Sequence, residues 1–172
     1  MAVTINGSAG VTTNSGAVYD SLQRATAVTA SGTSVDFTSI PSWVRRITVM
    51  FSGVSTSGAS VPIIQIGAGS VTTSGYLGSA ADIVGAVAAN FTTGFGTQAG
   101  GNAAHVRHGS VCIKNITGNT WVADGLIALS NTAQVYSSGG SLALGGTLDR
   151  VRITTVNGTD TFDAGTINII YE

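Results

Sequence analysis

Two histidines lie close enough in the chain to suggest a metal site. His105 and His108 are three positions apart, a spacing that puts two imidazoles on one face of a helix. We expect a strand here, and in a strand an odd separation points the side chains to opposite faces. A third ligand is missing nearby in the sequence. We therefore interpret both histidines as ordinary surface or interface residues and predict no metal and no cofactor.

The closest acidic pair is Asp160 and Asp163. Glycosidases need two carboxylates that flank the scissile bond. This pair follows Asn157-Gly158, the strongest turn signal of the chain, which we interpret as a hairpin turn. Aspartates beside turns commonly accept local backbone hydrogen bonds, and this is the interpretation we favour.

Other signatures of catalysis are missing from the sequence. The serines form no Gly-x-Ser-x-Gly elbow with plausible partners, and Gly94-Phe95-Gly96 lacks the rest of a dinucleotide fingerprint. Cys112, the single cysteine, stands between Val111 and Ile113 and is expected to be a buried packing residue. We predict a protein without enzymatic activity.

Four of the six arginines come in close pairs, Arg45 with Arg46 and Arg150 with Arg152. They could pair with aspartates across a sheet or a subunit boundary, or they could lie on a solvated strand face. We treat them, together with Tyr171, as candidate subunit-interface or docking residues.

Trp43, Tyr76 and Trp121 are the candidate ligand contacts. Aromatic rings of this kind stack on glycans or fill interfaces, although packing in the core or at a strand edge is their more common role. Both interpretations stay open for these three residues.

Strands must position these side chains. Residues 44–51 alternate, with Ile47, Val49 and Phe51 on one face and Arg46, Thr48 and Met50 on the other. Gly-rich turn signals separate this run from further apolar runs. Many short strands with such turns predict a sandwich or a barrel. The predicted strands are 44–51, 62–67, 105–116, 125–130, 141–144, 150–156 and 166–171.

Two stretches do not fit this pattern. Residues 79–104 are the least strand-like, and we expect a short helical turn near 80–89 followed by a Gly-rich loop. Residues 1–23 are small and polar, which predicts an extended N-terminal arm or docking segment ahead of a β-domain at 24–172. The opening Met1–Gly7 has no basic region or long apolar run, so we expect synthesis in a cytoplasm.

Composition narrows the class of protein. Only 9% of the residues are charged, with one lysine, Lys114, and one glutamate, Glu172. The formal net charge of −1 argues against a nucleic-acid partner, and no apolar run is long enough for a membrane helix. So little charge limits the solubility of a free monomer, which predicts that other subunits cover part of the surface.

Three blocks of the chain resemble a module of tailed-bacteriophage structural proteins, of tail-fibre or decoration type. They are Ile40–Ser55, which begins Ile-Pro-Ser-Trp-Val-Arg-Arg, then Gly75–Gly78, and Leu148–Gly165, which begins Leu-Asp-Arg-Val-Arg. Met1–Gly7 also resembles the start of such fibre proteins, and the resemblance covers most of residues 25–172. It implies an antiparallel β-sandwich, jelly-roll-like by analogy with virion modules, that forms a homotrimer in the virion.

Three functions remain to be compared. The first is a tail-fibre or tail-tip module for host attachment, with loops such as 79–104 contacting a host-surface glycan. The second is a capsid decoration, or cement, protein that binds other virion proteins. The third is a carbohydrate-active enzyme, which would have to use Asp160 and Asp163. We favour the first.

Overall fold

The regular elements among the described residues are β-strands. The computed structural model describes residues 3–6, 10–13, 18–19, 22–83 and 87–172. No helix in this described part is long and apolar enough to cross a membrane. The all-β prediction is confirmed. The strands are β1 Val3–Asn6, β2 Gly10–Thr13, β3 Val18–Tyr19, β4 Gln23–Arg24, β5 Val28–Thr29, β6 Ser34–Thr38, β7 Arg46–Thr56, β8 Pro62–Ala68, β9 Ser70–Val71, β10 Leu77–Asp82, β11 Ala88–Phe91, β12 Phe95–Gly96, β13 Arg107–Thr117, β14 Thr120–Leu129, β15 Gln134–Ala143, β16 Arg150–Thr155 and β17 Phe162–Tyr171.

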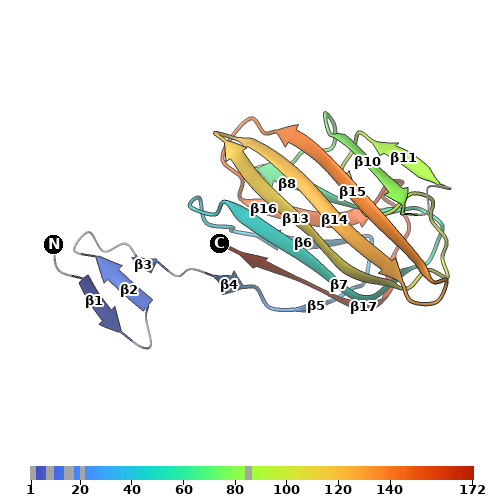
Figure 1. The fold of residues 1–172 in the computed structure, drawn as a ribbon, viewed down its shortest axis with the longest axis horizontal. Helices are drawn as coiled ribbons and strands as arrows, with labels where there is room; N and C mark the ends of the chain where they lie inside the picture. Colours follow the sequence, from blue (N-terminus) through green and yellow to red (C-terminus); the bar gives the residue numbers. More distant parts are fainter. Residues whose placement is uncertain (1–2, 7–9, 14–17, 20–21, 84–86) are drawn as a thin grey trace.

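Two antiparallel sheets enclose one core, as in a β-sandwich (Figure 1). The larger sheet has nine strands in the order β11-β10-β15-β14-β13-β7-β17-β4, and β5 also pairs with β17. The smaller sheet has the order β12-β8-β16-β6, with β9 paired to β8. The short strands β1, β2 and β3 pair with one another in a separate sheet. The predicted domain start at residue 24 lies within β4, whose Gln23 already pairs with Tyr171.

Alternation of buried and outward residues along β7 and β16 builds much of the core. Ile47 and Val49 of β7 are fully buried. Arg46, on the opposite face of the same strand, is exposed, as the sequence pattern predicts. Val151 and Ile153 of β16 contribute the matching apolar face of the smaller sheet. Each such side chain stabilises the fold by about 1.5–3 kcal/mol when it leaves water.

The same alternation corrects the expectation for Cys112. Val111 and Ile113 are fully buried, so the thiol between them points away from the core. Cys112 is half-buried on the opposite face of the sheet, where its sulfur accepts a hydrogen bond from the Thr48 hydroxyl at 3.7 Å. A residue between two core residues of a strand must lie on the other face.

The helical turn expected near residues 80–89 is wrong for the residues that the structure describes there. Strand β10 runs to Asp82 and β11 begins at Ala88, while residues 84–86 lie outside the described part. Ala80 and Phe91 pack on Ile63 of β8 in a small second cluster. An alanine-rich segment has little preference of its own for strands, so this packing decides its conformation.

Asn157-Gly158 forms a turn, but the hairpin prediction is wrong. Gly158 has a φ of +69°, and its N–H donates to the Thr155 carbonyl at 3.0 Å. The turn joins β16 to β17, which belong to different sheets. Asp160 fastens this corner by accepting the backbone N–H of Ser60 at 2.8 Å. Turn chemistry is local, whereas the sheet that the next strand joins is set by distant residues.

The first residue of β13 is a buried arginine. Arg107 is 0% exposed, and its Nε donates to Gln98 Oε1 at 2.6 Å while Nη1 donates to the His105 carbonyl at 3.2 Å. Nη2 finds no partner among the described residues. Burial lowers the pKa of Arg107 to about 10, against an opposing effect of the Asp163 charge. The guanidinium therefore resides where its charge is poorly solvated.

We predict that Arg107→Met leaves the free energy of unfolding at pH 7 unchanged or raises it, by up to about 4 kcal/mol, because it removes a poorly solvated charge and keeps most of the volume. Denaturant unfolding of the full chain measures this. Arg107→Ala, which also leaves a cavity, should be less stable than the methionine variant. A methionine variant clearly less stable than the unchanged chain would show that the hydrogen bonds of Arg107 outweigh its desolvation.

Candidate binding pocket

Five of the residues singled out by the sequence meet at one end of the sandwich: Trp43, Arg45, Arg46, Trp121 and Tyr171. The backbone N–H groups of Arg45 and Arg46 donate to the Glu172 carbonyl at 2.7 and 2.8 Å. The rings of Trp43 and Tyr171 lie 6.1 Å apart. Arg45 and Trp121 line one pocket. The end of β17 is thus tied to the segment that enters β7.

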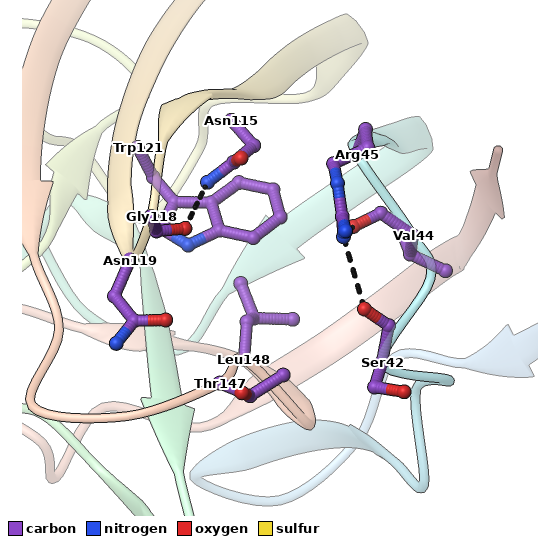
Figure 2. Close-up of a pocket in the computed structure, with 9 residues that line it drawn as sticks. All are labelled: Ser42, Val44, Arg45, Asn115, Gly118, Asn119, Trp121, Thr147 and Leu148. Atoms are coloured by element: carbon purple, nitrogen blue, oxygen red, sulfur yellow. Dashed lines mark hydrogen bonds between the residues drawn. The ribbon is translucent and has the colours of Figure 1, made fainter.

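The pocket has a volume of about 200 Å³ and is formed by three chain segments (Figure 2). One segment enters β7, one is the turn of the β13–β14 hairpin with the residues beside it, and one enters β16. None of its lining residues carries a carboxylate. The lining residues are Ser42, Val44, Arg45, Asn115, Gly118, Asn119, Trp121, Thr147 and Leu148.

Local hydrogen bonds hold two walls of the pocket in place. Arg45 Nη1 donates to the carbonyls of Ser42 and Val44, both at 2.9 Å, so its own segment anchors the guanidinium. Asn115 Nδ2 donates to the Gly118 carbonyl at 2.9 Å and spans the hairpin turn (Figure 2). A guanidinium has five N–H donors, so that of Arg45 keeps further donors for a ligand.

The inner wall holds a donor without an acceptor. Trp121 is 3% exposed, and its Nε1 has no hydrogen-bond partner among the described residues. Figure 2 shows this nitrogen on the ring edge that faces Asn119 and Leu148. Because the nitrogen is buried, an acceptor reaches it only after a shift of those neighbours. A buried N–H left unpaired costs about 1–3 kcal/mol, which such an acceptor would recover.

An exposed aromatic residue lies at the same end. Trp43 is 44% exposed and contacts Tyr171 at an interplanar angle of 46°. The Tyr171 hydroxyl donates to Gln23 Oε1 at 3.0 Å, which fixes that ring. Arg46 forms an ion pair with Glu172. Both partners are solvated, so the pair contributes at most about 1 kcal/mol.

The other two arginines lie on β16 and bind carboxylates there. Arg152 makes two hydrogen bonds to Asp36, at 2.7 and 3.1 Å, directly across the β16–β6 pair. This is the pairing across a sheet that we expected as one possibility. Arg150 binds its neighbour Asp149 in the same bidentate way, at 2.7 and 3.1 Å. Hydrogen bonds to these carboxylates are the main cause of the raised pKa values of both arginines.

Tyr76 does not fit the expected ligand contact, because it is a core residue. It is 1% exposed and packs edge-on against Phe95 at 4.9 Å. Its hydroxyl accepts the Ile66 N–H at 2.8 Å and donates to the Thr72 carbonyl at 3.0 Å. Burial raises the Tyr76 pKa above its ordinary value. The tyrosine therefore ties β8 to the segment after β9.

The histidines hold neighbouring segments together. His105 Nδ1 lies 2.9 Å from Gln98 Nε2, and His108 Nδ1 accepts the Gly53 N–H at 3.3 Å. Burial is the main cause of a lowered His105 pKa, with a smaller effect of the Arg107 charge. In the part of the chain that the structure describes, no group of three or more His, Cys, Asp or Glu side chains could hold a metal ion.

The sequence indicated part of this pocket. Trp121 and Arg45 were singled out, and Gly118-Asn119 is a turn signal. Ser42, Thr147 and Leu148 carried no such signal, because nothing in a local pattern shows that their segments converge.

The two tryptophans of the chain should report on their different surroundings. In Trp43→Phe, the remaining Trp121 should emit at short wavelength and resist quenching by acrylamide, because it is buried. In Trp121→Phe, the remaining Trp43 should emit at longer wavelength and be quenched readily. Steady-state fluorescence with a quencher titration measures both, and equal quenching of the two variants would contradict this geometry.

Comparison with protein-family models, with curated proteins and with solved structures yields no match to this chain. Its function is therefore inferred from the residues themselves.

Proposed function

We propose that this chain is a non-enzymatic structural protein of a tailed-bacteriophage virion, of tail-fibre or tail-tip type, and that the Trp121 pocket contacts an acidic glycan of the host surface. The resemblance of residues 40–55, 75–78 and 148–165 supports the virion role. The pocket supports the attachment role, and it is the observation on which the proposal depends.

The chemistry of the pocket favours a carboxylate-bearing sugar. Arg45 has donors left for a ligand, the indole N–H of Trp121 can donate once Asn119 and Leu148 shift, and no lining residue carries a charge that repels an anion. The hydroxyls of Ser42 and Thr147 can both donate and accept, which suits the hydroxyls of a sugar ring. Val44 and Leu148 add apolar surface for its C–H groups. Trp121 is 3% exposed, so its ring face is not open to a stacked sugar, and a hydrogen bond from its N–H is the contact that we expect there.

The strand order supports assigning a jelly-roll-like fold. Successive strands alternate between the two sheets along β6, β7 and β8, and again along β15, β16 and β17. Strand β16 returns to lie between β6 and β8. A long connection that brings a later strand back beside earlier strands is typical of Greek keys and jelly rolls. The β13–β14 hairpin is then an addition to the larger sheet.

The second candidate is a capsid decoration protein. The small volume of the pocket favours it, because about 200 Å³ is below the range of roughly 300–1,000 Å³ usual for ligand sites. An acidic side chain of a neighbouring virion protein would fit such a space. Location in an imaged particle separates the two roles, since a decoration protein covers the head and a fibre module lies on the tail.

A carbohydrate-active enzyme is not proposed. Asp160 accepts hydrogen bonds from Asn157 Nδ2 and from the Ser60 N–H, both at 2.8 Å, and these lower its pKa. Asp163 accepts the hydroxyl of Ser55. The two carboxylates are thus engaged in local contacts at the β16–β17 corner.

Glycan binding can be followed in the Trp43→Phe variant, whose single indole lies in the pocket. An oligosaccharide of glucuronic acid should shift its fluorescence saturably, and a neutral glucose oligosaccharide should shift it far less. Adding Arg45→Ala should weaken binding about tenfold or more, because a hydrogen bond to a charged group is lost. Arg152→Ala, which removes the same charge from the other sheet, is the matched control. Absence of a saturable shift at millimolar sugar would refute the attachment role.

A further inference from the structure

Residues 97–106 cross from the smaller sheet to the larger one, between β12 and β13, and we call them the crossing segment. This segment brings polar side chains into the interior. Gln98 and the adjoining Arg107 are both 0% exposed, and His105 is half-buried beside them. Buried donors need acceptors, so the hydrogen bonds of these three side chains show which of their atoms carry protons.

Arg107 decides which way the Gln98 amide points. A guanidinium nitrogen can only donate, so the Gln98 atom that lies 2.6 Å from Arg107 Nε is the oxygen, Oε1. The amide nitrogen of Gln98 donates to the Gly100 carbonyl at 2.7 Å. Turning the amide round would set its nitrogen against Arg107 Nε and its oxygen against that carbonyl. One orientation therefore satisfies both neighbours.

The second hydrogen of the Gln98 amide nitrogen identifies the protonation state of His105. This nitrogen lies 2.9 Å from His105 Nδ1, and because it donates, Nδ1 has to accept. A ring nitrogen that accepts a hydrogen bond carries no proton. His105 is therefore neutral, with its proton on the other ring nitrogen. The chain of donors from Arg107 through Gln98 to His105 is complete only with a neutral imidazole.

A proton on His105 Nδ1 breaks this chain in either orientation of the amide. With the amide as it stands, the new N–H faces the Gln98 amide nitrogen, donor against donor. With the amide reversed, His105 gains an acceptor and Arg107 Nε loses one. Arg107 Nη2 already has no partner among the described residues, so the reversed amide leaves two guanidinium nitrogens unpaired. Buried donors without acceptors destabilise a fold.

The charges around His105 favour the same neutral state. Arg107 of β13 acts on the imidazole with a positive charge, and Asp163 of β17 acts on Arg107. Asn131, after β14, binds the backbone on either side of His105 and is uncharged. Among the described residues no carboxylate forms an ion pair with His105. Burial first, and the Arg107 charge second, hold the pKa of His105 below its ordinary value.

The ends of the crossing segment are attached independently of His105. The N–H and the hydroxyl of Thr97 both donate to the Pro62 carbonyl of β8, at 3.2 and 2.7 Å. The Val106 carbonyl accepts the N–H of Ser130, after β14, at 3.0 Å. Residues 102–104 between these ends are exposed. A change at His105 therefore loosens the middle of the segment while its ends stay attached to the two sheets.

We infer that His105 is a pH-sensitive switch, which holds the crossing segment while its Nδ1 accepts the Gln98 amide and releases it when Nδ1 takes up a proton. The folded chain binds this proton less readily than the unfolded chain. The stability that the switch contributes is therefore complete above about pH 6.5 and is lost as the pH falls. None of its residues lines the Trp121 pocket, so the inference does not depend on glycan binding.

Denaturant unfolding of the full chain at pH 7 and pH 5 tests the switch. The ratio of folded to unfolded chain should fall by up to about 25-fold, the limit for one histidine that stays neutral when folded and titrates near 6.5 when unfolded. His105→Asn should lose much less, because its side-chain oxygen takes the place of Nδ1 and accepts the amide at either pH. His108→Asn, which removes the other histidine, is the matched control and should keep the fall.

Gln98→Glu should reverse the sign. A carboxylate at position 98 accepts from Arg107 Nε and also from a protonated His105, so the charged imidazole gains a partner. This variant should be no less stable at pH 5 than at pH 7. A fall in Gln98→Glu or in His105→Asn as large as that of the unchanged chain would contradict the switch.

Nuclear magnetic resonance reads the state of His105 without any change to the Gln98 site, and it decides if a variant loses its cooperative unfolding transition. In His108→Asn and in the unchanged chain, Nδ1 of His105 should carry no proton at pH 7. Protection of backbone amides in residues 98–105 against hydrogen exchange should fall at pH 5, ahead of the amides of β13. A proton on Nδ1 at pH 7, or unchanged protection of this segment once His105 is protonated, would overturn the inference.

Discussion

Contact between the apolar faces of two sheets is the interaction on which the rest of this structure depends. Ile47, Val111 and Ile113 of the larger sheet share one core with Ile64 and Ile153 of the smaller sheet, and all are fully buried. Because side chains alternate along a strand, a shift of register by one residue would turn a whole apolar set to solvent. The inward set thus determines what every outward residue can do.

Scarce charge is used locally throughout the described part of the chain. Arg152 binds Asp36, Arg150 binds Asp149, and Lys114 binds Asp124, each on or beside one sheet. Such solvated pairs stabilise the fold only slightly, so their main effect is to neutralise charge on the surface. The same poverty of charge leaves the buried Arg107 without an ion-pair partner within the described residues.

The pocket and the core depend mainly on different parts of the chain. The pocket depends on three loops that meet at one end of the sandwich, where Arg45 and Trp121 present donors without a facing acid. The core depends on the paired strands of the two sheets. Loops tolerate variation more readily than paired strands, so the lining of the pocket can change while the two sheets are kept.

The sequence by itself determined several of the strands and their inward faces, β7 and β16 among them, but it did not indicate β6, β10 or β11. The alternation at Arg46–Phe51 and at Arg150–Thr155 is a local property of a strand, readable from period two alone. Composition also showed how little charge there is to distribute. The same local logic misplaced Cys112, because apolar neighbours suggested burial where alternation requires the opposite face.

Only the tertiary structure decided which segments meet. Asn157-Gly158 makes a turn in any context, yet β17 joins the larger sheet because its inward residues pack there. Residues 80–82 and 88–91 form strands because Ala80 and Phe91 pack on Ile63 and because β10 pairs with β15. The meeting of Ser42, Trp121 and Leu148 joins segments far apart in the chain. Such pairings depend on packing between distant residues, and no periodicity within one segment contains that information.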